Sequence, residues 1–205
     1  MGETEGLPRR VAWRQHGTPA DPRAHIIDAA SRCLATVGLE RTSLTTIANE
    51  SGVSRQTIYK YFATKDEIIV EALEKEASDA SERIMAVARK NTTAAGFVVE
   101  LLVSAYSEFK RNPAISPVVA VLEGPAARAR VLTPDVVATV RHFLEPILSY
   151  LPDREPELDE MTETYMRFLL SLLTFESTAT RSQDSLRRYL HRVLVPALGL
   201  PSESI

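Results

Sequence analysis

The sequence predicts an all-α protein of two domains, on three observations. Apolar residues recur three and four positions apart along most of the chain, which is the spacing of one helical face. Capping residues such as Ser43 and Ser54 stand before these periodic segments, and Gly52 ends one of them. Short helices fill the first third of the chain and longer apolar ones the remainder. We therefore expect a small helical domain over residues 21–67 and a larger one over residues 68–205.

The composition is that of a globular protein. Of the 205 residues, 44% are apolar and 25% are charged. No apolar run approaches the roughly 18 residues of a membrane span, and the amino terminus is too polar for a secretory signal. We expect a cytoplasmic protein that does not engage a membrane. The lone Cys33 cannot form an internal disulfide, and its apolar neighbours favour a buried side chain over a redox sensor.

Charge is distributed unevenly along the chain. The net charge of −3 by itself argues against a strongly basic nucleic-acid binder. Residues 1–65, however, hold nine Lys and Arg against six Asp and Glu, whereas residues 66–205 hold fifteen against twenty-one. A basic amino-terminal module joined to an acidic remainder suits a DNA-binding head on a body that does not touch DNA.

Residues 1–20 lack sustained periodicity and contain several glycines and prolines, so we expect a flexible basic arm. Arg9, Arg10 and Arg14 give this arm its charge. It could reach a neighbouring DNA groove, as arms do beside other helix-turn-helix modules, or it could be a disordered tail. The sequence leaves both alternatives open.

The first expected helix begins at Asp21 and Pro22, a capping residue followed by a first-turn proline, and ends at Gly38. Its inward face should hold Ile26, Ala30, Cys33, Leu34 and Val37. This helix would brace the two that follow it.

Two short helices and a tight turn come next. Ser43 can cap a helix whose inward residues are Leu44, Ile47, Ala48 and Ser51. Gly52 should end it, because glycine adopts a positive φ without steric cost. Ser54 can then cap the next helix, and Val53 and Ile58 can form a hydrophobic staple across its start.

The helix that begins at Ser54 carries residues suited to base recognition. Ile58, Tyr61 and Phe62 should point toward the first helix. The residues left on or near the outer face, none of them acidic, are Arg55, Gln56, Thr57, Tyr59 and Lys60. An ordinary helical hairpin with a solvated face is the alternative. The helix caps, the hydrophobic staple, the glycine turn and the outer face occur together here, as a helix-turn-helix requires.

This stretch resembles the DNA-binding signature of TetR-type (TetR/AcrR-like) transcriptional regulators. The resemblance rests on Thr46-Ile47-Ala48, Gly52-Val53-Ser54, Thr57-Ile58-Tyr59, Tyr61-Phe62, and Lys65 followed by Asp66 and Glu67. It implies an all-helical homodimeric repressor with an amino-terminal three-helix helix-turn-helix DNA-binding domain. It also implies a carboxy-terminal helical domain for dimerisation and for binding a small effector that releases the protein from its operator.

We expect the helix beginning at Ser54 to enter the major groove of double-stranded DNA, within a palindromic operator. Arg55, Gln56 and Thr57 would contact base edges, because arginine pairs with guanine and glutamine with adenine. The residues expected to contact phosphates are Ser43, Thr45, Ser54, Tyr59, Lys60 and Lys65.

The second domain should begin with a long helix. Thr64 and Glu67 have the spacing of a capping box, and the periodic pattern then continues to about Lys90. Another helix should begin at Thr92 or Thr93 and end near Asn112.

The remaining elements are less regular. Residues 113–132 should be helical in part, with boundaries that the prolines and glycine leave open. A clearer helix should run from Thr133 toward Tyr150, with a possible kink at Pro146, and residues 152–157 should form a loop.

Aromatic residues concentrate in the larger domain and suggest a pocket for a small apolar or amphipathic effector. The candidates are Phe97, Leu101, Tyr106, Phe109, His142, Phe143, Tyr165 and Phe168. Core packing alone explains the apolar ones equally well.

The last two expected helices are apolar over more of their circumference than a two-layer domain needs, which suggests a homodimer. In the resembling family the last two helices pack against their copies in a second subunit, and the Arg167 to Ser171 segment and the one beginning at Leu186 look like that arrangement. The interface candidates are therefore Arg167, Ser171, Leu172, Leu186, Leu190 and Leu194. A wholly buried core helix is the alternative.

Catalysis finds little support in the sequence. The four histidines are scattered, and neither a metal-binding spacing nor a glycine-rich phosphate loop is present. We expect no enzyme, no metal and no cofactor. A small-molecule carrier or enzyme using the larger domain is the alternative function, and it would leave the amino-terminal head unexplained.

Overall fold

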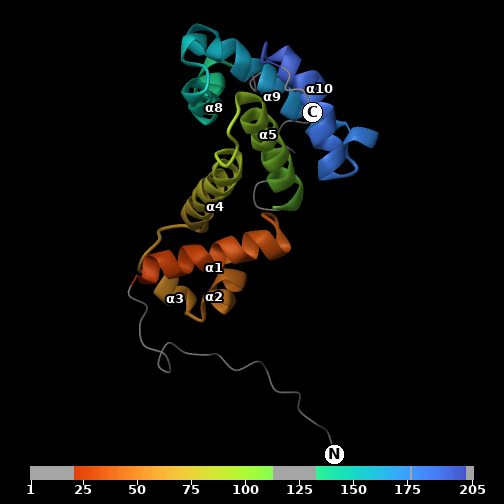
Figure 1. Ribbon diagram of the computed structural model, residues 1–205. Helices are drawn as coiled ribbons and strands as arrows, with labels where there is room; N and C mark the ends of the chain where they lie inside the picture. Colours follow the sequence, from red (N-terminus) through yellow and green to blue (C-terminus); the bar gives the residue numbers. More distant parts are fainter. Residues whose placement is uncertain (1–20, 113–132, 176, 202–205) are drawn as a thin grey trace, which may run out of the picture. The chain divides into compact units, whose positions relative to one another are not determined.

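The computed structural model describes residues 21–112, 133–175 and 177–201, and the regular secondary structure in these ranges is helical (Figure 1). The expected all-α fold is thus confirmed. The expected arm over residues 1–20 and the uncertain segment over residues 113–132 lie outside the described residues.

The chain divides into two compact units, Met1–Ala77 and Ser78–Ile205. The division falls later than the boundary expected at residue 67. Helix α4 (Lys65–Ala88) begins in the first unit, where Ile68 is fully buried, and continues into the second. The first turns of α4 therefore belong to the core of the smaller unit.

The first unit contains α1 (Pro22–Val37), α2 (Leu44–Ser51) and α3 (Arg55–Ile58) together with the start of α4. Asp21 caps α1 as expected, because its carboxylate accepts from the amides of the first turn. Helix α1 packs against α2. The fully buried large side chains of this unit are Ile26, Leu34, Ile47, Ile58, Phe62 and Ile68.

Two residues of α1 test its expected inward face. Cys33 is 7% exposed, and burial raises the pKa of its thiol, as befits a small buried apolar side chain. Val37 was expected to be buried but is 39% exposed. It is the last residue of α1, and the chain turns away at Gly38, whose φ is 78°.

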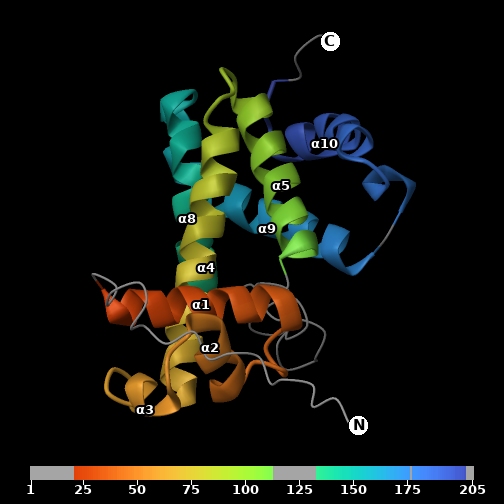
Figure 2. The same ribbon diagram turned by 90° about the horizontal axis from the view of Figure 1, so that it is seen from below.

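The second unit is organised around α5 (Ala94–Arg111), which Thr93 caps by accepting from the Gly96 amide at 3.1 Å. Helix α5 packs against α9 (Leu158–Thr174) and α10 (Gln183–Ala197), and it lies beside α10 in both views (Figures 1 and 2). The inner face of α5 is almost wholly apolar. In the residues that the structure describes, no helix is both long and apolar enough to cross a membrane.

The expected helix from Thr133 toward Tyr150 is divided in two. Helix α8 (Pro134–Leu144) passes into a 3-10 helix, η2 (Glu145–Ser149), at the Pro146 where a kink was expected. Proline has no amide hydrogen to continue the α-helical ladder, so the tighter turn follows.

The loop expected over residues 152–157 is wrong, because this segment forms the 3-10 helix η3 (Pro152–Glu157). Two arginines hold it in place. Arg141 of α8 pairs with Glu155 at 2.8 Å, and Arg154 donates to the carbonyls of Leu198 and Gly199 at 3.2 and 3.0 Å. These contacts come from distant parts of the chain, so a local reading of the segment missed them.

Candidate nucleic-acid interface

The turn between α2 and α3 has the expected geometry. Ser43 caps α2, accepting from the Thr46 amide at 3.2 Å, while the Thr46 hydroxyl accepts from the Ser43 amide at 2.8 Å. This reciprocal pair was not predicted, because its usual signature has Glu or Gln at the third position. Gly52 ends α2 with φ 69° and ψ 12°, the left-handed conformation that glycine favours.

Helix α3 is short, and a side-chain cap holds its first turn. The Ser54 hydroxyl accepts from the Thr57 amide at 3.0 Å. Val53 and Ile58 are buried on either side of this cap, as a staple predicts. The cap therefore fixes the direction in which α3 begins after the loop at Gly52 and Val53.

Of the residues expected to point inward from α3, Phe62 is buried but Tyr61 is 38% exposed, so the expectation for Tyr61 is wrong. The regular α-helix already ends at Ile58, and Phe62 takes the inner position. The guanidinium of Arg23 lies 4.6 Å above the centre of the Phe62 ring.

The outer face of α3 is exposed in the part of the chain that the structure describes. Arg55, Gln56, Tyr59 and Lys60 are exposed, and Thr57 is half-buried. The structure thus brings the expected base-contacting and phosphate-contacting residues onto neighbouring turns of one surface.

The other expected phosphate contacts lie on neighbouring segments. Ser54 and Thr45 are exposed, whereas Ser43 and Lys65 are half-buried. Arg55 donates to the hydroxyl of Thr45, so a residue assigned to bases is held by one assigned to phosphates. Sequence spacing did not reveal this contact between α3 and α2.

Arg23 connects three segments of this unit, and the sequence analysis did not single it out. Besides covering Phe62, it pairs with Glu67 at 3.3 Å and with Glu71, both on α4. The hydrogen bond to Glu71 raises the pKa of Arg23. The helical spacing of the two glutamates is the signal that could have indicated a basic partner.

The capping box expected at the start of α4 is formed with one difference. Thr64 accepts from the Glu67 amide at 3.1 Å, as expected. The carboxylate of Glu67, however, accepts from the amide of Ala63 at 2.8 Å, one residue before the cap. Glu67 therefore ties the end of the α3 segment to the first turn of α4.

The expected effector-pocket residues lie in the second unit with different exposures. Phe97, Leu101 and Tyr165 are buried, and burial raises the pKa of the Tyr165 hydroxyl. The half-buried members are Tyr106, Phe109, Phe143 and Phe168. The side chain of His142 is 82% exposed and lies 3.2 Å from Glu145, so it faces solvent in the described structure.

The expected dimer-interface residues divide into two groups. Leu186, Leu190 and Leu194 are at most 1% exposed within a single chain, where they belong to its own core. Arg167 and Ser171 are exposed on α9. Leu172 is 6% exposed.

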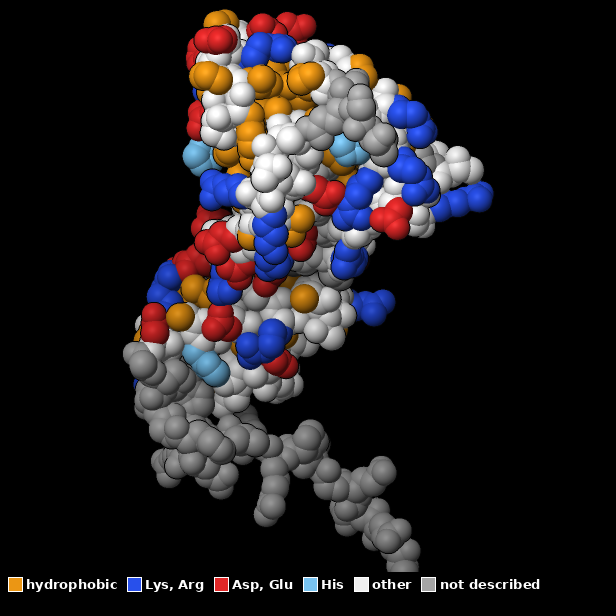
Figure 3. All heavy atoms as spheres, viewed as in Figure 1, with side chains coloured by type: hydrophobic (Ala, Val, Ile, Leu, Met, Phe, Trp, Pro, Cys, Tyr) orange, Lys and Arg blue, Asp and Glu red, His pale blue; other side chains and the backbone are white. Residues whose placement is uncertain are grey.

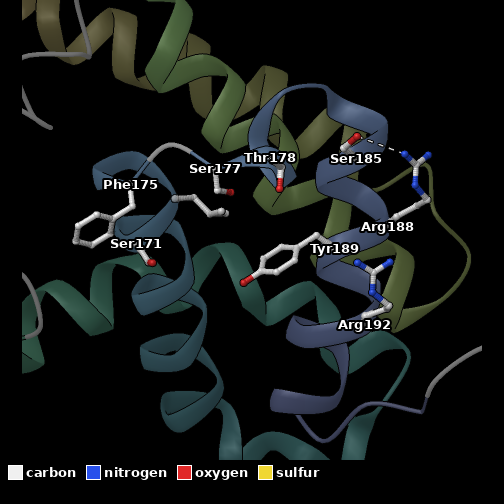
Figure 4. Close-up of a pocket in the computed structure, with 9 residues that line it drawn as sticks. Ser171, Phe175, Ser177, Thr178, Ser185, Arg188, Tyr189 and Arg192 are labelled. Carbon is white, nitrogen blue, oxygen red and sulfur yellow. Dashed lines mark hydrogen bonds between the residues drawn. The ribbon is translucent and has the colours of Figure 1, made fainter.

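A cavity of about 560 Å³ opens between the end of α9 and the start of α10, a part of the second unit over which Lys and Arg side chains gather (Figure 3). The short helix η4 (Thr178–Thr180) contributes Thr178 to the wall of this cavity. Its lining residues are Ser171, Leu172, Phe175, Ser177, Thr178, Ser185, Arg188, Tyr189 and Arg192. The ring of Tyr189 extends from α10 toward α9 (Figure 4). Leu172 and Ser171 come from the expected dimer interface; none of the expected effector-pocket residues lines this cavity.

The smaller unit is similar to a known family of regulators. Residues 26–72 match the family model described as bacterial regulatory proteins, tetR family. The chain is also 25% identical over 130 residues to an uncharacterised HTH-type transcriptional regulator of Haemophilus influenzae. That match covers 63% of this chain and 62% of the relative's length.

Solved structures of similar fold extend over most of the chain. A TetR/AcrR-family regulator from Thermobifida fusca has a TM-score of 0.59 at 20% identity, covering 85% of this chain and 97% of that one. The TetR-family repressor AlkX from Dietzia has a TM-score of 0.55 at 18% identity, covering 89% and 98%. Thermus thermophilus FadR, a repressor solved with lauroyl-CoA, has a TM-score of 0.52 at 20% identity, covering 89% and 97%. At these identities the likeness shows the fold.

Proposed function

We propose that this chain is a TetR-type regulator, a homodimeric repressor that binds a palindromic operator and is released by a small effector. The single observation that carries the DNA-binding role is the outer face of α3, where Arg55 and Gln56 are exposed on a helix held by the Ser54 cap and the Gly52 turn. A rigid start to the helix gives the two side chains a fixed approach to a major groove.

The residues of this face divide by chemistry. Gln56 and Arg55 carry side chains that pair with adenine and guanine edges, and Thr57 can present a methyl or hydroxyl group. Tyr59 and Lys60 lie beyond them on the same surface and suit phosphate oxygens, which fix the register without reading sequence. Lys65 joins this second group at the start of α4.

Repression would be steric, because a dimer bound over a promoter excludes polymerase. AlkX and FadR are both described as repressors, and FadR was solved with lauroyl-CoA, an amphipathic molecule. Their shared fold supports a small apolar or amphipathic effector in the second unit. An effector releases the operator only if it binds the DNA-incompetent state more tightly.

The proposed dimer uses α9 and α10, but without the three α10 leucines that were expected in its interface. Leu186, Leu190 and Leu194 are buried within one chain and so are unavailable to a partner. Phe175, 68% exposed at the end of α9, and the exposed Ser171 are available. A repressor of this kind acts in the cytoplasm, where operator DNA lies.

The alternative is a carrier or enzyme that acts through the second unit, and it gives no role to the exposed face of α3.

The test is to select bound sequences from random duplex DNA and then to assay the upstream region of the protein's own gene. The proposal predicts an inverted repeat whose half-sites are centred about one helical turn, or a multiple, apart. Binding without sequence preference, or sites without two-fold symmetry, would contradict it.

A further inference from the structure

The cavity of about 560 Å³ between α9 and α10, which we call the α9–α10 cavity, lies within the second unit. Three elements form its walls: α9 contributes Ser171, η4 contributes Thr178, and α10 contributes residues from Ser185 to Arg192. Small-molecule sites in proteins occupy roughly 300 to 1,000 Å³. The α9–α10 cavity therefore has room for a small ligand.

Two guanidinium groups give the α9–α10 cavity a positive wall. Arg188 and Arg192 stand four positions apart on α10, so both leave the same side of that helix. Both side chains are exposed, and Arg188 donates one hydrogen bond to the hydroxyl of Ser185 at 3.3 Å (Figure 4). Each guanidinium carries five N–H donors, so most of the donors of these two groups are left for a ligand.

These two arginines differ from five other arginines of the second unit. Carboxylates pair at 2.5 to 3.1 Å with Arg83, Arg141, Arg154, Arg167 and Arg187. Among the described residues, no carboxylate lies within ion-pair distance of Arg188 or Arg192. The described residues that line the cavity also include no Asp or Glu. A positive wall without an acidic neighbour attracts anions.

The other walls of the α9–α10 cavity are hydroxylated and partly apolar. Ser177 and Thr178 are exposed, and their hydroxyls can donate to an anion. The half-buried ring of Tyr189 extends from α10 toward α9 (Figure 4). Leu172, 6% exposed, and Phe175, 68% exposed, add apolar surface on the α9 side. The cavity thus presents charged groups from α10 and apolar groups from α9.

We propose that the α9–α10 cavity binds a small organic anion, a carboxylate or phosphate monoester that carries an apolar group. Arg188 and Arg192 hold the anionic group, because the planar guanidinium fork pairs with two oxygens of a carboxylate or phosphate. The apolar group packs against Leu172, Phe175 and the ring of Tyr189. This site is separate from the proposed effector pocket, since none of the candidate residues of that pocket lines the α9–α10 cavity.

Isothermal titration calorimetry with four probes tests the chemistry of the site. Benzoate and phenyl phosphate carry different anionic groups on the same ring, whereas benzamide lacks the charge and inorganic phosphate lacks the ring. We expect the two aromatic anions to bind at least about tenfold more tightly than benzamide, because charge-assisted hydrogen bonds are the stronger ones. Inorganic phosphate should bind more weakly than phenyl phosphate. The tighter of the two aromatic anions identifies the preferred anionic group.

Removing the two charges tests the residues. Arg188→Gln with Arg192→Gln changes two exposed positions, so circular dichroism should show an unaltered fold. This variant should bind both aromatic anions about tenfold or more weakly than the unaltered protein. The matched control, Arg89→Gln with Lys90→Gln, removes the same charge from exposed residues that do not line the cavity. The control should bind the probes as the unaltered protein does.

Hydrogen exchange locates the bound probe. Phenyl phosphate should slow amide exchange in peptides that cover residues 171–192, because its contacts would hold α9, η4 and α10 together. Peptides that cover the middle of α5, where Phe97 and Leu101 of the proposed effector pocket lie, should exchange at an unchanged rate. Slowing confined to α5 would overturn the assignment to the α9–α10 cavity.

The outcomes separate the site from the proposed homodimer. Binding that is undiminished in the Arg188→Gln, Arg192→Gln variant would overturn the site. Benzamide binding as tightly as benzoate would overturn it too, and inorganic phosphate binding as tightly as phenyl phosphate would show an adventitious ion only. Sedimentation velocity on the same samples reports the oligomeric state. A dimer that binds neither aromatic anion overturns the site alone, and a monomer that binds them overturns the homodimer alone.

Discussion

Arg55 of α3 donates a hydrogen bond to the hydroxyl of Thr45 on α2, although ten positions separate the two residues in sequence. Both side chains are exposed on the proposed DNA-binding surface. The bond holds the guanidinium before any DNA arrives, so less of its conformational freedom remains to be lost on binding. We therefore expect Thr45 to position Arg55 for DNA binding.

Replacing Thr45 by Val should release Arg55 without changing the size of the side chain. We expect affinity for the selected operator to fall by about 1 kcal/mol, the scale of one hydrogen bond, and preference to relax at the base that Arg55 reads. Binding to operators altered at single positions checks this. Thr45→Ser keeps the hydroxyl and should behave like the unaltered protein; an equal loss in both variants would contradict the positioning role.

Gly52→Ala should weaken both stability and DNA binding. A non-glycine residue at φ 69° costs about 1 kcal/mol, and strain at this turn also changes how α3 leaves α2. Gly38→Ala is the control at the end of α1, where φ is 78° and ψ is 172°, a conformation that an alanine adopts even less readily. Thermal unfolding should show a loss for both, whereas operator binding by the folded protein should weaken only for Gly52→Ala.

Burial raises the pKa of Cys33, which makes stability depend on pH at the alkaline end. Because the folded pKa lies above the unfolded value, the thiol's contribution is fully present below about pH 8.5 and is lost as pH rises through the folded pKa. Urea unfolding between pH 7 and 10 should therefore show a decline that is shallower in Cys33→Ala. Equal slopes in the two proteins would contradict this account.

Charge at Leu190 and at Phe175 should have different consequences. Leu190 is 0% exposed in a single chain, so Leu190→Asp should unfold the second unit, at a cost of several kcal/mol. Phe175 is 68% exposed, so Phe175→Asp should leave the monomer folded while weakening the dimer. Circular dichroism and sedimentation measured together separate the two effects. A folded, monomeric Leu190→Asp protein would restore Leu190 to the interface.

Sequence reasoning succeeded where the determining interactions are local. Ser43, Gly52 and Ser54 act on their own turn, so their types predict the caps and the left-handed residue directly. Contacts between distant segments were missed, as with Arg55 and Thr45 or with Arg154 and the end of α10. Sequence spacing within one helix cannot show which other helix a side chain will meet.

The unexpected burial of the three α10 leucines within one chain has a related cause. The last two helices are apolar over a wide arc, and that width predicts two partners without saying which arc meets which partner. Leu190 lies in the core of its own unit, where α10 packs against α5, whereas the polar Ser171 and Arg188 are exposed. Only the packing of α10 against α5 shows which side of α10 is buried within the chain and which side is exposed.

The proposed DNA-binding surface divides into base-reading residues on α3 and phosphate-binding residues that include Lys65 at the start of α4, and the most direct measurement of this division compares Gln56→Ala with Lys65→Ala. Selection from random duplex DNA gives the base preferences of each variant, and binding at several salt concentrations gives its salt dependence. Gln56→Ala should lose about 1 to 3 kcal/mol on the cognate operator and relax preference at one base in each half-site. Lys65→Ala should weaken binding to all duplexes and lower the salt slope by about one unit, with base preferences retained. Indistinguishable specificity profiles for the two variants would contradict the assignment.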